Sequence, residues 1–379
     1  MNDTAHEERF GVSSLELFFD LVFVFAITQV TALIAADPTA TGMLRGVLLL
    51  ALVWWSWVAY AWIGTTVRVD LGLPALVFGA AMGAMLVVAT TLPQWFTGSR
   101  IAWIAVITYV TVRAMHLGLF LVLGRGTPGI AGATARLAVG VGLGAVLLLI
   151  GTGVGGTAQL VLVALAVTAD FAGALLGRGR GWVVHVEHFA ERHGLIVIIA
   201  LGESLIALGL AASDTAMSGG VLLTLAAGFA LSAAIWLLYF ARETAPLEHA
   251  LHSATGAARG RAARDLCSYL HFPIVLGIVL VALALKKGVV AIDVGGLGAT
   301  LHGVGAIALG LGVPLVLGAL VAMRARERSG IPSPLMLALV GAALIGLGAA
   351  QVPLLAVILA QTVLVAAATL RRADGILRG

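Results

Sequence analysis

Charged residues are scarce in this 379-residue chain, at 11% of the total, whereas 61% of its residues are hydrophobic. A soluble domain of this size carries about 25% charged residues. Together with a mean hydropathy of +1.09, this scarcity excludes a soluble globular protein and predicts an integral membrane protein. The apolar residues form long runs without the alternation typical of barrel strands, which favours membrane-spanning α-helices over a β-barrel.

Cysteine is limited to one residue, Cys267, which excludes an intramolecular disulfide and a metal site built from several thiolates. The first 14 residues lack the basic segment and the small-residue cleavage site of a signal peptide, so we expect an uncleaved first helix. The net charge of +4 is concentrated in the connections between apolar runs. We interpret it as a topology signal and expect no nucleic-acid partner.

Apolar runs of about 18–22 residues predict an all-α polytopic fold with twelve transmembrane helices. Their expected limits are 15–36, 44–65, 73–92, 101–123, 134–151, 157–176, 194–212, 219–240, 268–286, 300–323, 334–350 and 352–370. The resulting parts are an N-terminal segment 1–14, a first helical half 15–176, an amphipathic polar segment 177–193, a second half 194–370 and a tail 371–379.

The distribution of basic residues predicts the orientation of the chain. Seventeen of the 22 Lys and Arg residues fall on the side that holds both termini, and only Arg45, Arg100, Lys286 and Lys287 fall on the other. Because cytoplasmic loops of membrane proteins are enriched in Lys and Arg, we expect both termini in the cytoplasm.

Short segments of the two halves are similar at nearly constant offsets. Trp57-Val-Ala-Tyr60 matches Trp236-Leu-Leu-Tyr239 179 residues later, and residues 20–29 match residues 194–203 at an offset of 174. Such a spacing predicts two parallel repeats of six helices. Chance similarity between apolar segments is the alternative.

Glu203 lies in an otherwise apolar run, 195–212. Because a carboxylate inside a bilayer is costly, it usually faces a partner, a cavity or a transport path. Arg113 keeps its charge and needs a partner, for which Glu203, Asp20 and Asp170 are candidates. The other polar residues in or beside the expected helices are Glu16, Ser204, Tyr269 and His271. Most of these groups fall in the cytoplasmic half, which predicts a polar cavity open to that side.

The polar segment before Glu203 contains His185, His188, Glu191, Arg192 and His193. The i, i+3 spacing of His185 and His188 can hold one metal ion, and the spacing of His188 and His193 is similar to that in membrane di-iron oxidases. Because imidazole suits iron, copper and zinc, Fe, Cu or Zn is a candidate cofactor. A proton relay and an amphipathic surface stretch, both without a cofactor, are the alternatives.

Two motifs, Leu15-Glu16-Leu-Phe-Phe-Asp20-Leu-Val-Phe-Val-Phe and residues 188–204, resemble the bacterial low temperature requirement A family. Trp54-Trp55-Ser-Trp57, Arg113 and His271-Phe-Pro273 support the resemblance. It implies a multi-spanning protein of the bacterial cytoplasmic membrane but no particular activity. The site candidates that it carries over are Glu16, Asp20, His188, Glu191, Arg192, His193, Glu203 and Ser204.

The first of three functional hypotheses is a secondary, proton-coupled transporter of a small solute or lipid-like molecule. Glu203, Glu191 and Asp20 would handle protons in such a carrier. Its path would be lined by Glu16, Arg113, Asp170, Arg192, Ser204, Tyr269 and His271. The second hypothesis is an intramembrane enzyme with a cytoplasm-facing site, in which Glu203 or Glu191 would act as general acid or base, with or without a His-bound metal ion. The third is a non-catalytic stress-response component. Membrane lipids are expected partners, and a homodimer is an open alternative to a monomer.

Overall fold

The computed structural model describes residues 11–125, 128–176, 179, 181–327, 330–331 and 333–370, and these contain no β-strand. The first half comprises α1 (Ser14–Ala36), α2 (Ala40–Gly64), α3 (Gly72–Thr91), α4 (Arg100–Leu123), α5 (Pro128–Val154) and α6 (Gly156–Leu176). The second half comprises α7 (Val186–Ser213), α8 (Gly219–Arg242), α11 (His271–Gly295), α12 (Gly303–Glu327), α13 (Ser333–Leu347) and α14 (Leu354–Leu370). These helices correspond one to one to the expected spans. The expected tail 371–379 and most of the segment 1–14 lie outside the described residues.

Within the described residues, ten helices are long and apolar enough to cross a membrane, and α13 and α14 are shorter apolar helices. Many of their apolar side chains face outward, as they do in a protein whose surroundings are lipid; Leu76, Val139 and Leu344 are all more than 60% exposed. The prediction of an all-α polytopic membrane protein is therefore confirmed.

Some expected helix limits were wrong. Helix α7 begins at Val186 and not at residue 194, because His188 and Arg192 of its first two turns are buried and bond Glu16 of α1. Helix α11 continues past residue 286 to Gly295, so Lys286 and Lys287 lie inside it. The expected connection between α8 and α11 contains α9 (Thr244–Ser253), α10 (Gly256–Ala263) and a π-helical turn, Arg264–Tyr269.

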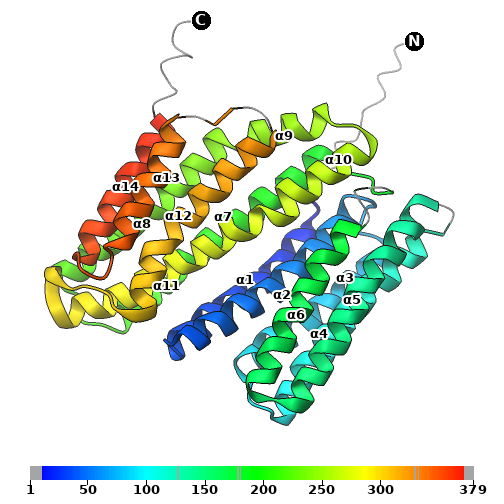
Figure 1. Ribbon diagram of the computed structural model, residues 1–379, viewed down its shortest axis with the longest axis horizontal. Coiled ribbons are helices and arrows are strands. Elements are labelled where there is room, and N and C mark those ends of the chain that lie inside the picture. The colour runs from blue at the N-terminus through cyan, green and yellow to red at the C-terminus, as the bar shows by residue number, and fades with distance from the viewer. Residues whose placement is uncertain are drawn as a thin grey trace, which may run out of the picture.

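The helices of each half follow one another in a closed circuit of neighbours, and the two halves lie side by side (Figure 1). In the first half the circuit runs α1–α3–α4–α5–α6–α2 and returns to α1. In the second half it runs α7–α11–α12–α13–α14–α8 and returns to α7. Taken in chain order, each helix of the first half thus has a counterpart with the same neighbours. The helices α1 and α7, which are counterparts, contact each other where the halves meet.

Several helix ends meet at one end of the bundle, which we call the terminal end because α1 begins there and α14 ends there. The amide of Val12 lies 3.4 Å from Glu191 Oε2 at the start of α7. Arg242 Nε at the end of α8 donates to the Thr369 carbonyl at 2.9 Å. The end of α12 joins the π-helical turn through Arg326 Nη2 and Asp265 Oδ2, 2.9 Å apart.

Candidate functional site

The first buried carboxylates stand at the start of α1, where a capping box sets their position. Ser13 Oγ accepts from the Glu16 amide at 3.3 Å, and Glu16 Oε2 accepts from the Ser13 amide at 3.0 Å. Such reciprocal bonds satisfy amides that the first helical turn leaves without partners. Asp20 follows one turn later on the same face, and both carboxylates are buried.

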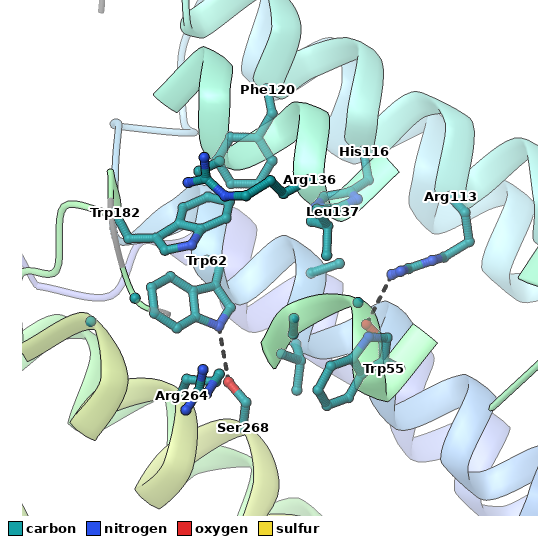
Figure 2. Close-up of a pocket in the computed structure, with 17 residues that line it drawn as sticks. Trp55, Trp62, Arg113, His116, Phe120, Arg136, Leu137, Trp182, Arg264 and Ser268 are labelled. Atoms are coloured by element: carbon teal, nitrogen blue, oxygen red, sulfur yellow. Dashed lines mark hydrogen bonds between the residues drawn. The ribbon is translucent and has the colours of Figure 1, made fainter. Parts of the chain in front are cut away.

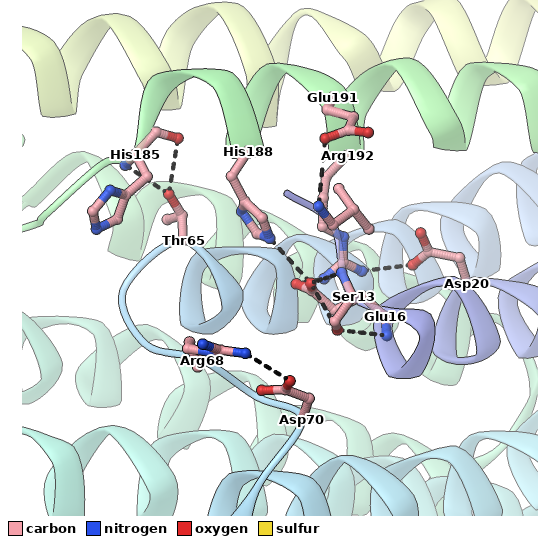
Figure 3. Close-up of polar contacts among 11 residues, drawn as sticks. Ser13, Glu16, Asp20, Thr65, Arg68, Asp70, His185, His188, Glu191 and Arg192 are labelled. Atoms are coloured by element: carbon pink, nitrogen blue, oxygen red, sulfur yellow. Dashed lines mark hydrogen bonds and ion pairs between the residues drawn. The ribbon is translucent and has the colours of Figure 1, made fainter. Parts of the chain in front are cut away.

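Helix α7 brings a guanidinium and an imidazole to these carboxylates (Figure 3). Arg192 Nη1 donates to Glu16 Oε1 at 2.8 Å and Nη2 donates to Asp20 Oδ1 at 2.6 Å. His188 Nε2 lies 3.0 Å from Glu16 Oε2. We call these four residues, Glu16, Asp20, His188 and Arg192, the α1–α7 ion cluster. All four are buried, so the cluster holds the two helices together away from solvent.

Helix α2 completes the ion cluster from a third side. Trp57 Nε1 donates to Asp20 Oδ1 at 2.8 Å, and the second oxygen of Asp20 is buried without a hydrogen-bond partner among the residues that the structure describes. A Cβ atom at Gly64 would overlap Glu16 Oε1 and stand 3.3 Å from Arg192 Nη1. The position therefore needs glycine because the ion pair occupies the space of a side chain.

The formal charges of the ion cluster depend on His188. Two carboxylates face one guanidinium, so the cluster carries one net negative charge when His188 is neutral and none when it is protonated.

Of the three partners expected for Arg113, Asp170 is the one that pairs with it in the structure. Arg113 Nη2 lies 3.1 Å from Asp170 Oδ1, and Nη1 donates to the Trp55 carbonyl at 3.1 Å. This pair links α4 to α6 inside the first half. Asp20 pairs with Arg192 instead, and Glu203 has a different environment.

Glu203 is buried in the middle of α7, where the Thr28 hydroxyl of α1 donates to its Oε2. No Lys, Arg or His of the described residues forms an ion pair with it. The neighbouring Ser204 hydroxyl lies 3.4 Å from the Ile278 carbonyl of α11. The Thr31 hydroxyl also bonds Glu203, and Lys286 of α11 is near enough to interact with it electrostatically without forming an ion pair. Glu203 is thus a carboxylate in the bilayer region that is bonded by hydroxyls, in contrast to Glu16, Asp20 and Asp170, which pair with arginines.

A second group of aromatic and imidazole side chains packs behind the ion cluster. His193 donates from Nδ1 to the Phe189 carbonyl at 2.8 Å, and its ring stands 5.1 Å from that of His271. His271 Nδ1 bonds the Leu266 carbonyl at 2.8 Å, so its Nε2 accepts from the Tyr239 hydroxyl at 2.7 Å. The Tyr239 bond links α8 to α11, and the contact between the two imidazole rings brings α7 against α11.

Three further site candidates lie away from the ion cluster. The His185 backbone precedes α7 and bonds the Thr65 hydroxyl, as Figure 3 shows. Glu191 is exposed at the start of α7. The Tyr269 hydroxyl donates to the Phe171 carbonyl of α6. None of the three reaches Glu203 or Arg192 through a hydrogen bond in the described part of the chain.

The structure does not assemble the histidines of the polar segment into a metal site. His188 bonds a carboxylate and His193 bonds a backbone carbonyl. Across the described ranges, no group of three or more His, Cys, Asp or Glu side chains is placed to hold a metal ion. The geometry of His185, His188 and His193 therefore offers no support for Fe, Cu or Zn as a cofactor.

Two residues of the site were missed by the sequence analysis. Gly64 has no chemistry of its own and is needed only for its lack of a side chain. Thr28 lies eight residues after Asp20, a rotation of about 80° around the helix, so its spacing from the acidic residues did not indicate it.

Comparisons with known proteins agree with the architecture. Residues 11–369 match the family described as bacterial low temperature requirement A protein (LtrA). The chain is 26% identical over 280 residues to the uncharacterized protein RA0937 of Rhizobium meliloti (strain 1021), which covers 70% of this chain and 67% of the relative. No solved structure matches the chain. Because the family match spans nearly the whole sequence, this membrane protein belongs to the bacterial low temperature requirement A family.

Proposed function

We propose that this protein is a proton-coupled secondary transporter of a small solute or lipid-like molecule in the bacterial cytoplasmic membrane. Glu203 is the observation that carries the proposal. It is a buried carboxylate without an ion-pair partner among the described residues, and it lies between the two halves of the bundle. Ionisable groups at such positions mark ion pathways and proton relays in membrane proteins.

The second support is the pattern of helix neighbours. The two closed circuits of helices are consistent with a duplicated six-helix unit, with both copies in the same orientation. Parallel repeats of this kind occur in transporters, whose substrate sites lie where the repeats meet. Here the meeting helices, α1 and α7, contain the ion cluster as well as Glu203.

The polar groups are spaced along this contact between α1 and α7. The ion cluster lies toward the terminal end, and Glu203 lies eleven residues beyond Arg192, or roughly 16 Å along the helix axis. In the proposed mechanism His188 and Glu203 are two separate proton sites. We place the terminal end in the cytoplasm, because most Lys and Arg residues are found on that side.

An intramembrane enzyme finds less support in this geometry. The described pocket is not lined by Glu16, Asp20, Glu191 or Glu203, so none of these carboxylates faces the space there that a substrate could fill. A general base must lie within reach of a substrate proton.

The test measures proton flux in proteoliposomes that contain a pH-sensitive dye. Small acids, amines and apolar anions are added one at a time to the outside. We expect at least one solute to elicit proton movement with the wild-type protein. Glu203→Gln should abolish this movement, because an amide cannot take up a proton at physiological pH. Unchanged thermal unfolding of the variant would show that the loss is not a folding defect.

Glu187→Gln is the matched control, because Glu187 is an exposed carboxylate near the start of the same helix. Its flux should equal that of the wild type. Solute-dependent proton movement that persists in Glu203→Gln would contradict the proposed coupling role.

A further inference from the structure

The structure also contains a pocket between helices of the first half and the π-helical turn, away from the contact between α1 and α7. We propose that this pocket binds an amphiphilic anion, that is, a carboxylate or phosphate group attached to an apolar body. The pocket is lined by residues of α2, α4, α5, α6, α10 and the π-helical turn; its enclosed cavity has a volume of about 50 Å³, and the cavity opens to the outside. The proposal does not depend on transport, since binding can be measured in the absence of flux.

The charge of the lining has one sign. The polar residues among the 17 that line the pocket are Arg113, Arg136, Arg264, His116 and Ser268, and these described residues include no Asp or Glu. Asp170 and Asp265 bond Arg113 and Arg264 from outside the lining, at 3.1 and 2.6 Å. Such bonds hold the guanidinium groups in place. Guanidinium groups that converge on one cavity favour carboxylate and phosphate ligands.

His116 provides an independent indication of a ligand. Its side chain lines the pocket, is 0% exposed, and has no hydrogen-bond partner for either ring nitrogen within the described residues. Arg113, one turn earlier on α4, has an unbonded and buried Nε. Because a buried polar atom without a partner is costly, two such groups beside one cavity indicate a missing acceptor. In either protonation state imidazole offers at least one N–H donor.

Aromatic rings form an apolar wall next to these donors (Figure 2). The rings of Trp62 and Trp182 are 5.3 Å apart, those of Trp182 and Phe120 are 5.1 Å apart, and Phe120 and His116 are also 5.1 Å apart. Trp62 is fixed by its indole N–H, which donates to Ser268 Oγ at 2.9 Å. The wall suits an acyl chain or a planar ring, while the cationic groups suit the anionic end of the same molecule.

The ligand could be a membrane lipid with a phosphate headgroup or a soluble apolar anion, and one experiment separates these sources. The full-length protein is placed in phosphatidylcholine nanodiscs and titrated with decyl phosphate and decanoate, with decanol and decyltrimethylammonium as charge controls. The readout is the shift in thermal unfolding, from which a Kd is obtained. A second arm compares discs containing phosphatidylglycerol and uses native mass spectrometry to detect lipid retained by the protein.

Binding of both decyl anions, but not of the alcohol or the cation, is expected for a soluble ligand. Stoichiometric retention of an anionic lipid that decyl phosphate displaces is expected for a lipid ligand. Either result supports the pocket as an anion site. Equal binding of all four decyl compounds, together with no retained lipid, would overturn the proposal.

Two variants assign the binding to this pocket. Ala174→Trp fills the cavity and should abolish binding, whereas Ala172→Trp, on the exposed face of the same helix, should leave it unchanged. His116→Leu removes the donor and should weaken anion binding about tenfold or more. His116→Gln keeps a donor and should retain most of the affinity. Anion binding that survives both Ala174→Trp and His116→Leu would place the ligand elsewhere, and Glu203→Gln should bind like the wild type.

Discussion

At the residue scale, the cost of burying charge in a membrane explains most polar contacts between helices. Arg113 and Arg192 cannot release their protons, and each is held by carboxylates from another helix. The Ser268 carbonyl in the π-helical turn accepts the indole N–H of Trp54 at 2.9 Å. Such bonds replace water as the partner of each polar group.

The ion cluster makes Arg192 a strong determinant of stability. In the Arg192→Met variant the carboxylates of Glu16 and Asp20 would stay buried without the guanidinium that pairs with them. We expect a loss of about 3–5 kcal/mol in unfolding free energy, the usual cost of breaking a buried ion pair. This loss is measured by denaturant unfolding of the variant and the wild type in detergent. The triple variant with Glu16→Gln and Asp20→Asn should recover part of the loss, and a triple variant no better than Arg192→Met would contradict the ionic explanation.

Gly64 should be sensitive to the smallest substitution. Its Cβ in Gly64→Ala would overlap Glu16 Oε1, which we expect to destabilise the protein by about 1–3 kcal/mol, as overpacking does. Gly79→Ala, on the open face of α3, is the control and should leave the free energy of unfolding unchanged. Because Glu16→Asp shortens the carboxylate, the double variant should be more stable than Gly64→Ala alone. Additive losses in a double-mutant cycle would argue against this steric cause.

At the scale of elements, glycine decides how closely helices pack. Gly140 of α5 and Gly173 of α6 face each other, and a Cβ on Gly140 would stand 2.7 Å from the Ala169 carbonyl. Gly310 of α12 and Gly346 of α13 meet in the same way. Close approach of backbones replaces the hydrophobic effect as a source of helix association inside lipid.

Gly140→Ala should therefore push α5 away from α6. We expect it to lower the free energy of unfolding by about 1–3 kcal/mol. Gly142→Ala, two residues later on the same helix, has no atom within 4 Å of the added Cβ and should be neutral or slightly stabilising. The melting temperatures of the two variants are compared in the same detergent. Equal melting temperatures would show that the close contact between α5 and α6 at Gly140 does not contribute to stability.

At the scale of the whole molecule, the expected orientation can be tested with cysteines, because Cys267 is buried and can be replaced by Ala. Ser253 is the last residue of α9 at the terminal end, and Ala216 lies between α7 and α8 at the opposite end; both are exposed. In intact cells a membrane-impermeant maleimide should label Ala216→Cys and not Ser253→Cys. Permeabilised cells should show labelling of both. The reverse pattern in intact cells would place the terminal end outside.

Helix number and type followed from local properties of the sequence. Each apolar run is long enough to satisfy its backbone hydrogen bonds by itself, so twelve helices could be predicted without any knowledge of their neighbours. The beginning of α7 could not be predicted in this way. Its first turns contain polar residues such as Arg192, whose partner Glu16 lies on α1 against Gly64 of α2.

The sequence by itself determined the membrane class, the helices and the presence of buried carboxylates around Glu203. Only the tertiary structure decided that Asp170 pairs with Arg113, that Arg192 joins Glu16 and Asp20, and that Glu203 meets a hydroxyl. The partners of Arg192 lie 176 and 172 positions away in the chain. Hydropathy is a property of each segment alone, whereas the partner of a buried charge depends on which helices pack together.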